Sequence, residues 1–510
     1  MNDLSRIVLV SLCVALVGAC GDDTGEGGND AVLDSSQLDV IADTAADDAG
    51  NSGQEWAAPL ETGDWRIVHS YRGRVQGSNL GENDLWLLDS NGSTKSKLTD
   101  LAGLENVGTC VDSGKECNPN PEVNQVSGCE EEEECRPLSC NYGCFISDDL
   151  KWLAIADGPP TAQGFDFRIG QFKSNMEFKL IKNLILADKI DFQFVGDRLY
   201  YSEIAECVGA SCQYLVSYID LTTLATEELF TFPPGSDLEG STFKGHFKAS
   251  PNGERLILLN TTIRSVAVHM YKFGVGLIKL DFICKFGTED NCEGTGSEYN
   301  DQDPVALSHD SRWAVFFTFS DRWQRARVYD LDNPGVITLA VLASVPSGSY
   351  ISKACEFGLL ESWQWPRVIG DPKFTPDGTE IVFLTENDCP APNGTHPKKA
   401  QRNIMRVKLD TLLSGKTLEE SDVFSITENP KGDIKDNVFV SGYDVTSDGA
   451  TVVFTGSPSF DQSGEPLKDS SSRHRNDREV YRIRLDGTNR TQITNDPSWE
   501  AQSPHAIPGS

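Results

Sequence analysis

Fourteen cysteines are the residues of this 510-residue chain whose type and spacing most readily suggest chemistry. Two lie near the start, Cys13 and Cys20, and the others follow after residue 100. Six crowd into one segment and the rest fall in couples: Cys110, Cys117, Cys129, Cys135, Cys140 and Cys144, then Cys207 with Cys212, Cys284 with Cys292, and Cys355 with Cys389. Thiols at such spacings form disulfides or bind zinc, and the compartment decides which.

The first twenty residues indicate export. The apolar run from Ile7 to Val17 is too short to span a membrane and suits the core of a secretory signal. It ends in Val17-Gly18-Ala19-Cys20, which resembles the bacterial lipobox, whose cysteine is lipidated and becomes the mature N-terminus. The resemblance implies a lipoprotein signal peptide over residues 1–19 and a lipid anchor on Cys20. Gly21 stands where an Asp implies inner-membrane retention, so we expect the outer membrane, at its periplasmic or its surface face.

Residues 20–58 consist mainly of Gly, Ser, Ala, Thr and acids and contain no Lys or Arg. Such a segment buries too little apolar surface to offset its ordering entropy, so we predict a disordered acidic tether. Residues 59–510 then hold the folded part. The whole chain has a net charge of −33, which argues against binding nucleic acid through general electrostatics.

An oxidising compartment favours disulfides over zinc at the cysteines. Residues 108–145 therefore form a predicted disulfide-rich insertion. Six cysteines allow 15 connectivities, so the pairing within the insertion stays open. The acidic run Glu130–Glu134 and the turns 300–303 and 330–333 raise calcium as an alternative to solvated loops. Acidic residues are already favoured in turns, so no cofactor is predicted and calcium remains the open possibility.

Motifs for catalysis are missing from the sequence. It has no Gly-x-Ser-x-Gly elbow, no His-Glu-x-x-His and no complete Walker A motif. Its seven histidines have no ligand spacing, and we expect each of them on the surface or in a loop. Among the aromatics, Trp363, Trp365 and Arg367 gather beside a proline, and Trp and Arg are common interface anchors. These three residues are the predicted partner contact, with an ordinary blade edge as the alternative.

The elements that position these residues form a repeat. Turns with Asp or Asn, often followed by Gly, join pairs of apolar runs at residues 146–156, 194–203, 249–260, 307–318, 374–385 and 445–456. Asp-Gly and Asn-Gly between apolar runs are strong hairpin signals, and a further strand pair completes each unit. Four-stranded units without helical periodicity predict an all-β propeller, with seven blades as the best count and six or eight as alternatives.

Two of these stretches carry a family resemblance. FTPDGTEIVF at 374–383 and EVYRIRLDGTNRTQIT at 479–494 resemble the TolB-type propeller repeat. The resemblance implies an envelope protein that binds a protein partner, with a peptidoglycan-associated lipoprotein as one candidate. We expect no counterpart of TolB's separate N-terminal α/β domain.

The sequence therefore predicts a lipid-anchored binding or scaffold protein, and it leaves enzyme activity uncertain. One alternative is a polysaccharide lyase or hydrolase with its site at the channel mouth, which requires titratable residues from several blades to converge. Another is a calcium-stabilised scaffold. The similarity of residues 85–100 to 480–496 predicts that the first and last blades are neighbours. We further predict that Ala501–Ile507 adds a strand to the first blade and closes the ring.

Overall fold

A computed structural model describes the chain over the residues that form its blades. The described ranges are 65–73, 83–93, 95–98, 108–110, 116–117, 135–137, 144–156, 165–172, 178–186, 192–208, 211–232, 244–261, 265–284, 305–319, 323–344, 367–387, 401–427, 438–458, 478–495 and 499–508. The chain divides into Met1–Gln54 and Glu55–Ser510, and every described residue lies in the second unit. The predicted signal peptide, Cys20 and the whole predicted tether, residues 1–58, therefore lie outside the described residues.

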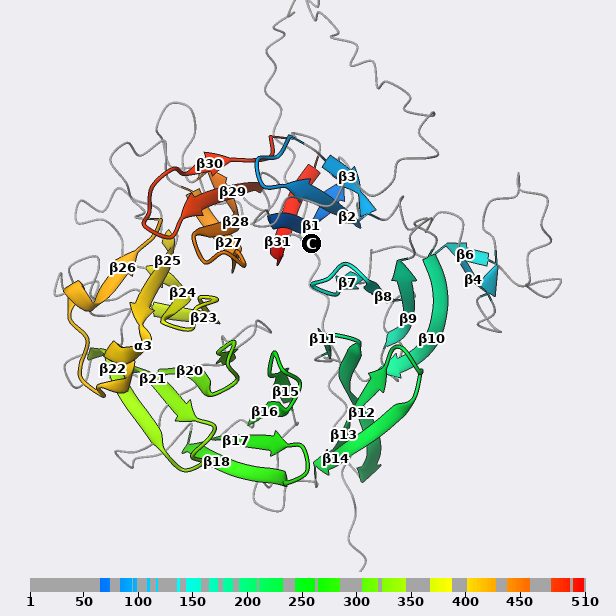
Figure 1. Ribbon diagram of the computed structural model, residues 1–510, viewed down its shortest axis with the longest axis horizontal. Helices are drawn as coiled ribbons and strands as arrows, with labels where there is room; N and C mark the ends of the chain where they lie inside the picture. The colour runs from blue at the N-terminus through cyan, green and yellow to red at the C-terminus, as the bar shows by residue number, and fades with distance from the viewer. Residues whose placement is uncertain are drawn as a thin grey trace, which may run out of the picture. The chain divides into compact units, whose positions relative to one another are not determined.

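Seven antiparallel four-stranded sheets form the blades (Figure 1). Blade 1 contains β31 (Trp499–Pro508), β1 (Trp65–Gly73), β2 (Asn83–Asp89) and β3 (Lys95–Lys97). Blade 2 contains β7 (Cys144–Ile146), β8 (Trp152–Ala156), β9 (Phe165–Phe172) and β10 (Phe178–Leu186). Blade 3 contains β11 (Phe192–Val195), β12 (Arg198–Val208), β13 (Ser211–Asp220) and β14 (Thr226–Phe232). Blade 4 contains β15 (Lys244–Ala249), β16 (Arg255–Thr261), β17 (Ser265–Lys272) and β18 (Gly276–Cys284).

The remaining three blades follow the same plan. Blade 5 contains β19 (Val305–Leu307), β20 (Trp313–Phe319), β21 (Trp323–Asp330) and β22 (Ile337–Ser344). Blade 6 contains β23 (Arg367–Phe374), β24 (Glu380–Asn387), β25 (Gln401–Lys408) and β26 (Val423–Ser425). Blade 7 contains β27 (Val438–Val445), β28 (Thr451–Pro458), β29 (Glu479–Arg484) and β30 (Thr491–Gln492). The predicted all-β, seven-bladed propeller is confirmed.

Seven hydrophobic clusters hold the blades together, and each cluster is shared by two neighbouring blades. The cluster between blades 7 and 1 contains Val453 and Val480 from one side and Ile67, Leu88 and Ala506 from the other. Each large apolar side chain that is fully buried contributes about 1.5–3 kcal/mol. Because the clusters link every blade to the next, including the last to the first, the ring is closed.

The C-terminal strand closes the ring as predicted. β31 pairs antiparallel with β1, from Trp65 opposite Pro508 to Gly73 opposite Trp499. The chain therefore supplies the first strand of blade 1 from its last residues. The prediction that Ala501–Ile507 adds a strand to the first blade is confirmed.

A repeated turn joins the first two strands of five blades. A Ser or Thr hydroxyl bonds the Asp or Asn two residues later, as from Ser250 to Asn252 at 2.7 Å and from Thr375 to Asp377 at 2.6 Å. The next residue has a positive φ, which glycine adopts without strain. Gly378 has this conformation, whereas Leu150 and Ser311 adopt it without being glycine. Blade 3 instead has the shorter turn Gly196-Asp197 between β11 and β12.

The two ends of the propeller differ in their connections. Successive strands alternate in direction, so first-to-second and third-to-fourth connections lie at one end, named here the tight-turn end. Second-to-third and blade-to-blade connections lie at the other, named the long-loop end. The long intervening segments, such as 285–304, 345–366 and 459–477, all attach to strand ends at the long-loop end. Trp65 and Pro508, where β1 begins and β31 ends, both lie at the tight-turn end.

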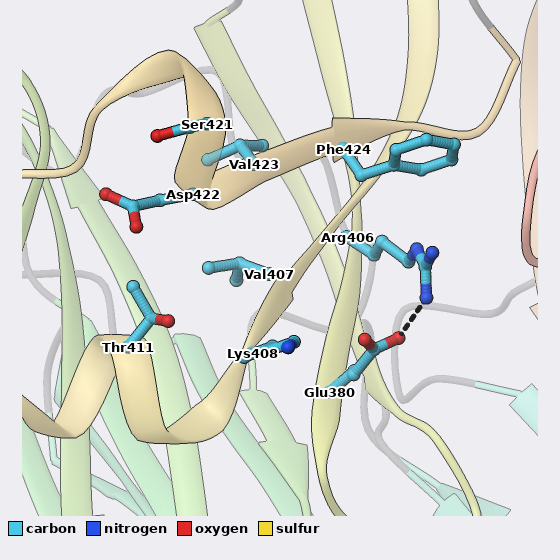
Figure 2. A pocket seen from close by; sticks show the side chains of 9 residues that line it. All are labelled: Glu380, Arg406, Val407, Lys408, Thr411, Ser421, Asp422, Val423 and Phe424. Atoms are coloured by element: carbon cyan, nitrogen blue, oxygen red, sulfur yellow. Dashed lines mark hydrogen bonds and ion pairs between the residues drawn. The ribbon is translucent and has the colours of Figure 1, made fainter.

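Blade 6 interrupts the pattern of short turns at the tight-turn end. Its third and fourth strands are joined by residues 409–422, which include the helix α3 (Leu409–Leu413) and the 3-10 turn η3 (Glu420–Asp422) (Figure 2). This excursion, residues 409–422, also contacts blade 5. The Leu418 N–H donates to the Val341 carbonyl at 2.8 Å, and Leu412 is buried in the cluster between blades 5 and 6.

Candidate functional site: a charged cluster on the inner strands

Four charged side chains from four blades meet on the inner strands near the tight-turn end. They are Asp148 of the turn after β7, Lys373 of β23, Asp444 of β27 and His505 of β31, and we name them the inner charged cluster. His505 Nδ1 lies 2.8 Å from Asp444 Oδ2, and its Nε2 lies 2.8 Å from Asp148 Oδ1. Lys373 Nζ donates to Asp444 Oδ1 at 2.9 Å.

Asp444 is the centre of this cluster and is almost fully buried. Besides Lys373 and His505 it accepts the backbone N–H of Ala506 at 2.9 Å and that of Val445 at 3.0 Å. Burial on its own would raise the pKa of the Asp444 carboxyl. The charge of Lys373 and the bond and charge of His505 outweigh burial, and the pKa falls well below its ordinary value.

His505 has the opposite shift. Burial favours its neutral form, but hydrogen bonds to Asp148 and Asp444 and the two negative charges raise its pKa to about 9. Near neutral pH the ring is an imidazolium, and both of its N–H groups donate to carboxylates. A ring in this state has no free lone pair with which to act as a general base.

The cluster instead links the blades where the chain closes. His505 belongs to blade 1, Asp444 to blade 7, Asp148 to blade 2 and Lys373 to blade 6. The ring closes within blade 1, where β31 and β1 are adjacent strands from opposite ends of the sequence and no turn joins them. Charge-assisted bonds are stronger than neutral ones, so the cluster reinforces this seam.

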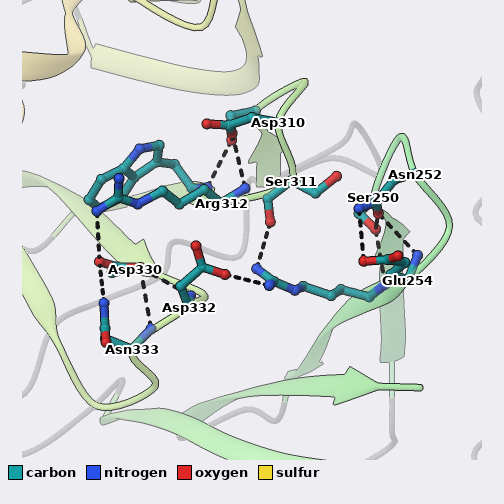
Figure 3. Close-up of polar contacts among 12 residues, drawn as sticks. Ser250, Asn252, Glu254, Asp310, Ser311, Arg312, Asp330, Asp332 and Asn333 are labelled. Atoms are coloured by element: carbon teal, nitrogen blue, oxygen red, sulfur yellow. Dashed lines mark hydrogen bonds and ion pairs between the residues drawn. The ribbon is translucent and has the colours of Figure 1, made fainter. Parts of the chain in front are cut away.

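Polar contacts also link the turns of other blades at the tight-turn end. Arg255 of blade 4 is nearly buried and crosses to blade 5, where its Nη1 donates to the Ser311 carbonyl at 2.8 Å and its Nη2 to Asp332 (Figure 3). Lys151 and Trp152 of blade 2 both donate to Asp197 of blade 3. Polar groups here are largely engaged with neighbouring turns.

Two further side chains repeat this arrangement. The Tyr200 hydroxyl of blade 3 donates to the Gly253 carbonyl of blade 4 at 3.1 Å. Arg482 Nη1 of blade 7 donates to the Ser90 carbonyl of blade 1 at 2.6 Å. In each case a side chain of one blade bonds the turn backbone of the next, so the turns act as a linked rim.

The structure describes part of the predicted cysteine set. Cys144 is disulfide-bonded. In the backbone register Cys207 lies opposite Cys212, and Cys110 of β4 (Gly108–Cys110) lies opposite Cys135 of β6 (Cys135–Pro137). Directly opposed antiparallel residues have Cα atoms about 4.5–5.5 Å apart, which suits a disulfide.

The structure says less about the pairing of the other predicted cysteines. Cys117 ends β5 (Glu116–Cys117), which pairs with β4, and Cys284 ends β18. Outside the described residues lie Cys20, Cys129, Cys140, Cys292, Cys355 and Cys389. The disulfide-rich insertion as a whole therefore stays a prediction.

The predicted partner contact falls mostly outside the described residues. Trp363 and Trp365 are not among them, and Arg367 is described only as the first residue of β23. That position is at the long-loop end, because β23 is the first strand of blade 6. Their role stays a prediction.

The acidic turn at residues 330–333 uses its carboxylate for its own backbone. Asp330 Oδ1 accepts the N–H groups of Asp332 at 3.0 Å and Asn333 at 3.3 Å. Across the part of the chain that the structure describes, no group of three or more His, Cys, Asp or Glu side chains could hold a metal ion. Calcium remains an open possibility, and thermal melting with and without chelator tests it.

Each histidine was expected on the surface or in a loop, and among the described residues the structure places four of them in strands, where His269 and His505 are only partly buried. His69, His246, His269 and His505 lie within strands. The sequence analysis also missed Asp148, Lys373 and Asp444, which are separated by up to 357 residues from His505. One sequence signal could have revealed the cluster: Lys373 and Asp444 each stand one residue before the end of the first strand of their blade.

Comparisons with known proteins agree with the fold and go no further. No family model and no curated protein sequence matches this chain. Within the described residues no helix has the length and apolar character needed to cross a membrane.

Solved structures of low identity resemble the chain. One is a protein from Lactobacillus plantarum, with 11% identity, a TM-score of 0.43, and coverage of 87% of this chain and 99% of that chain. Another is the β-propeller domain of the Trilobed protease from Pyrococcus furiosus, with 11% identity, a TM-score of 0.41, and coverage of 86% and 94%. A third is oligogalacturonate lyase from Vibrio parahaemolyticus, with 9% identity, a TM-score of 0.39, and coverage of 76% and 87%. Similarity at this level carries no inference about function.

Proposed function

We propose that this protein is a lipid-anchored binding protein of the bacterial cell envelope, a TolB-like propeller that presents its long-loop end to a protein partner. The observation that carries the proposal is the difference between the two ends. At the tight-turn end, side chains such as Arg255, Lys151 and His505 bond neighbouring blades. The long intervening segments attach at the other end, and such loops commonly supply specificity in propellers.

The course of the chain supports an orientation. β1 begins with Trp65 at the tight-turn end, so the preceding tether joins the propeller there. A lipid on Cys20 would then attach the protein to the membrane through the tight-turn end and leave the long-loop end free of the attachment. Arg367 begins β23 at the long-loop end, and Trp363 and Trp365 shortly precede it in the sequence.

The test is crosslinking pull-down from intact envelopes with a tagged, Cys20-anchored protein. We expect one partner to be recovered with the natural chain and lost when Trp363, Trp365 and Arg367 are all changed to Ala. Leu224→Ala with Val275→Ala is the matched control, since both side chains are exposed at the tight-turn end. Recovery of the bait alone, or an undiminished partner with the triple variant, would contradict the proposal.

A second candidate is a polysaccharide lyase or hydrolase, and one observation favours it. Titratable side chains from four blades do converge on the inner strands, and Asp148 is largely exposed. The occupied ring of His505 argues against it. Purified protein assayed with neutral and acidic polysaccharides separates the candidates: cleavage abolished by Asp148→Asn without loss of fold would establish the enzyme.

A further inference from the structure

We infer that blade 6 carries a binding site for a small hydroxylated carboxylate of the sugar-acid class. A hollow of about 240 Å³ lies between β24, β25, the 409–422 excursion and β26 (Figure 2). Its lining combines charged, hydroxyl and apolar side chains: Glu380, Arg406, Val407, Lys408, Thr411, Ser421, Asp422, Val423 and Phe424. The volume lies below the roughly 300–1,000 Å³ of drug-sized sites, which suits a ligand of about one sugar unit.

The charges in the hollow leave one cation available. Arg406 Nη1 donates to Glu380 Oε2 at 2.7 Å, and Asp422 Oδ1 accepts from Lys416 Nζ at 2.8 Å. Both acids are therefore neutralised by a neighbour. Lys408 is exposed and forms no ion pair with another described residue, so the lining has one unmatched positive charge. A monocarboxylate supplies the missing negative charge.

Three other features select the rest of the ligand. Glu380 and Asp422 keep carboxylate lone pairs that accept from hydroxyl groups, and the single unmatched charge of Lys408 balances a monoanion and not a dianionic phosphate. The Thr411 and Ser421 side chains add hydroxyls on the side of the hollow that carries Asp422 (Figure 2). Phe424 is 38% exposed, so its ring offers an apolar surface to the carbon skeleton of a sugar.

The wall that carries the cation is held in place by its neighbours. Arg406 lies over the Phe424 ring at 4.7 Å and donates a hydrogen bond to Glu380. The Arg406 and Glu380 side chains, which flank Lys408, are therefore held in place. The Arg406 Nε is buried and has no hydrogen-bond partner among the described residues. A pre-positioned lining lowers the ordering cost of binding.

A comparison with blade 4 shows that the 409–422 excursion is needed to enclose this hollow. Lys272 ends β17 of blade 4 in the same way that Lys408 ends β25 of blade 6. In blade 4 the next strand follows after residues 273–275, and no excursion covers the lysine. The site lies at the tight-turn end, so it is independent of the proposed partner surface, and either can fail alone.

The experiment is calorimetric titration of the full chain with D-glucuronate, D-glucose and acetate. We expect saturable binding of glucuronate, with glucose and acetate each at least about tenfold weaker, because a charge-assisted bond or the hydroxyl contacts are lost. Lys408→Gln should weaken glucuronate by about tenfold, and Lys272→Gln should leave it unchanged. Absence of saturable glucuronate binding, or equal affinity in Lys408→Gln, would overturn the inference.

Discussion

The tight-turn end and the long-loop end of this propeller are built from the same strands but differ in what their connections do. At the tight-turn end short turns repeat a Ser/Thr–Asp/Asn hydrogen bond and bond one another across blade boundaries. At the long-loop end the strands open into long segments that hold most of the cysteines. If the proposed partner binds the long-loop end, stability and recognition belong to opposite ends of one ring, and changes at each end should have separable effects.

The largest expected effect comes from Asp444 at the ring closure. Asp444→Ala leaves Lys373 and His505 without their shared carboxylate and removes the acceptor of the Ala506 and Val445 backbone N–H groups. Breaking a buried ion pair by removing one partner costs about 3–5 kcal/mol. Denaturant unfolding measures the loss.

Glu228→Ala on the exposed face of β14 is the control for this variant and should change stability by less than about 0.5 kcal/mol. Equal stability of the Asp444 and Glu228 variants would show that the cluster does not hold the seam.

Stability at the closure should also depend on pH through His505. Its folded pKa of about 9 lies above its ordinary value of 6.5, so its contribution is fully present below pH 6.5 and is lost as the pH rises through about 9. Unfolding free energies measured between these limits should fall with pH. His505→Gln should flatten that decline, and an unchanged slope would exclude His505 as its source.

Asp444 contributes with the opposite sign. Because its folded pKa lies below its ordinary value of 3.8, its contribution is present above pH 3.8 and is lost as the pH falls through the lower value. Acid unfolding of Asp444→Asn should therefore lack this component. The same acid dependence in the variant would assign the effect to other carboxyls.

A smaller loss should follow at the seam between blades 4 and 5. Arg255→Met removes donors to the Ser311 carbonyl and Asp332 from a nearly buried position and should cost about 1.5–3 kcal/mol. Arg312→Met is the matched control, since the Arg312 side chain is 47% exposed where that of Arg255 is 10% exposed. Exposed ion pairs contribute about 0–1 kcal/mol, so equal melting shifts would refute the distinction.

A gain of stability is expected at Ser311. This residue has φ 59°, and its buried hydroxyl has no hydrogen-bond partner among the described residues. Ser311→Gly removes the strain and the unpaired group and should stabilise the fold by about 0.5–1 kcal/mol. Gly378→Ser introduces the same strain in blade 6 and should lower stability by a similar amount. Thermal unfolding should give a higher midpoint for Ser311→Gly and a lower midpoint for Gly378→Ser than for the natural chain.

The smallest effect on stability is expected from the long-loop end. Changing Trp363, Trp365 and Arg367 to Ala should shift the unfolding free energy by less than about 0.5 kcal/mol while removing the partner. A loss comparable to that of Arg255→Met would mean that these residues support the blades, and the two ends would no longer differ in role.

The blades could be predicted from the sequence because their hairpin signals are local. Asp377-Gly378 and Asp448-Gly449 are direct turn signals. Strands that bury one face show an alternation of apolar and polar residues in the sequence. The turn at Ser311 was found from the flanking apolar runs although its positive-φ residue is not glycine. Closure by β31 followed from the similarity of the first and last units.

The inner charged cluster could not be predicted in this way. Asp148 and His505 meet only because the ring brings residues far apart in the chain together, and sequence spacing gives no measure of that approach. The excursion of blade 6 was missed for another reason. Residues 409–422 contain a short helix whose apolar residues pack between two blades, and nothing local distinguishes it from an inserted loop.

The proposed division of roles between the two ends is tested most directly by finding which end of the propeller contacts the partner. A photo-crosslinking residue is placed at Trp365 in one lipid-anchored protein and at Val275 in another, and both are irradiated in intact envelopes. If the partner binds the long-loop end, we expect a specific adduct from position 365 and none from position 275, where the exposed side chain lies at the tight-turn end. An adduct from position 275 alone, or equal adducts from both, would contradict this division of roles.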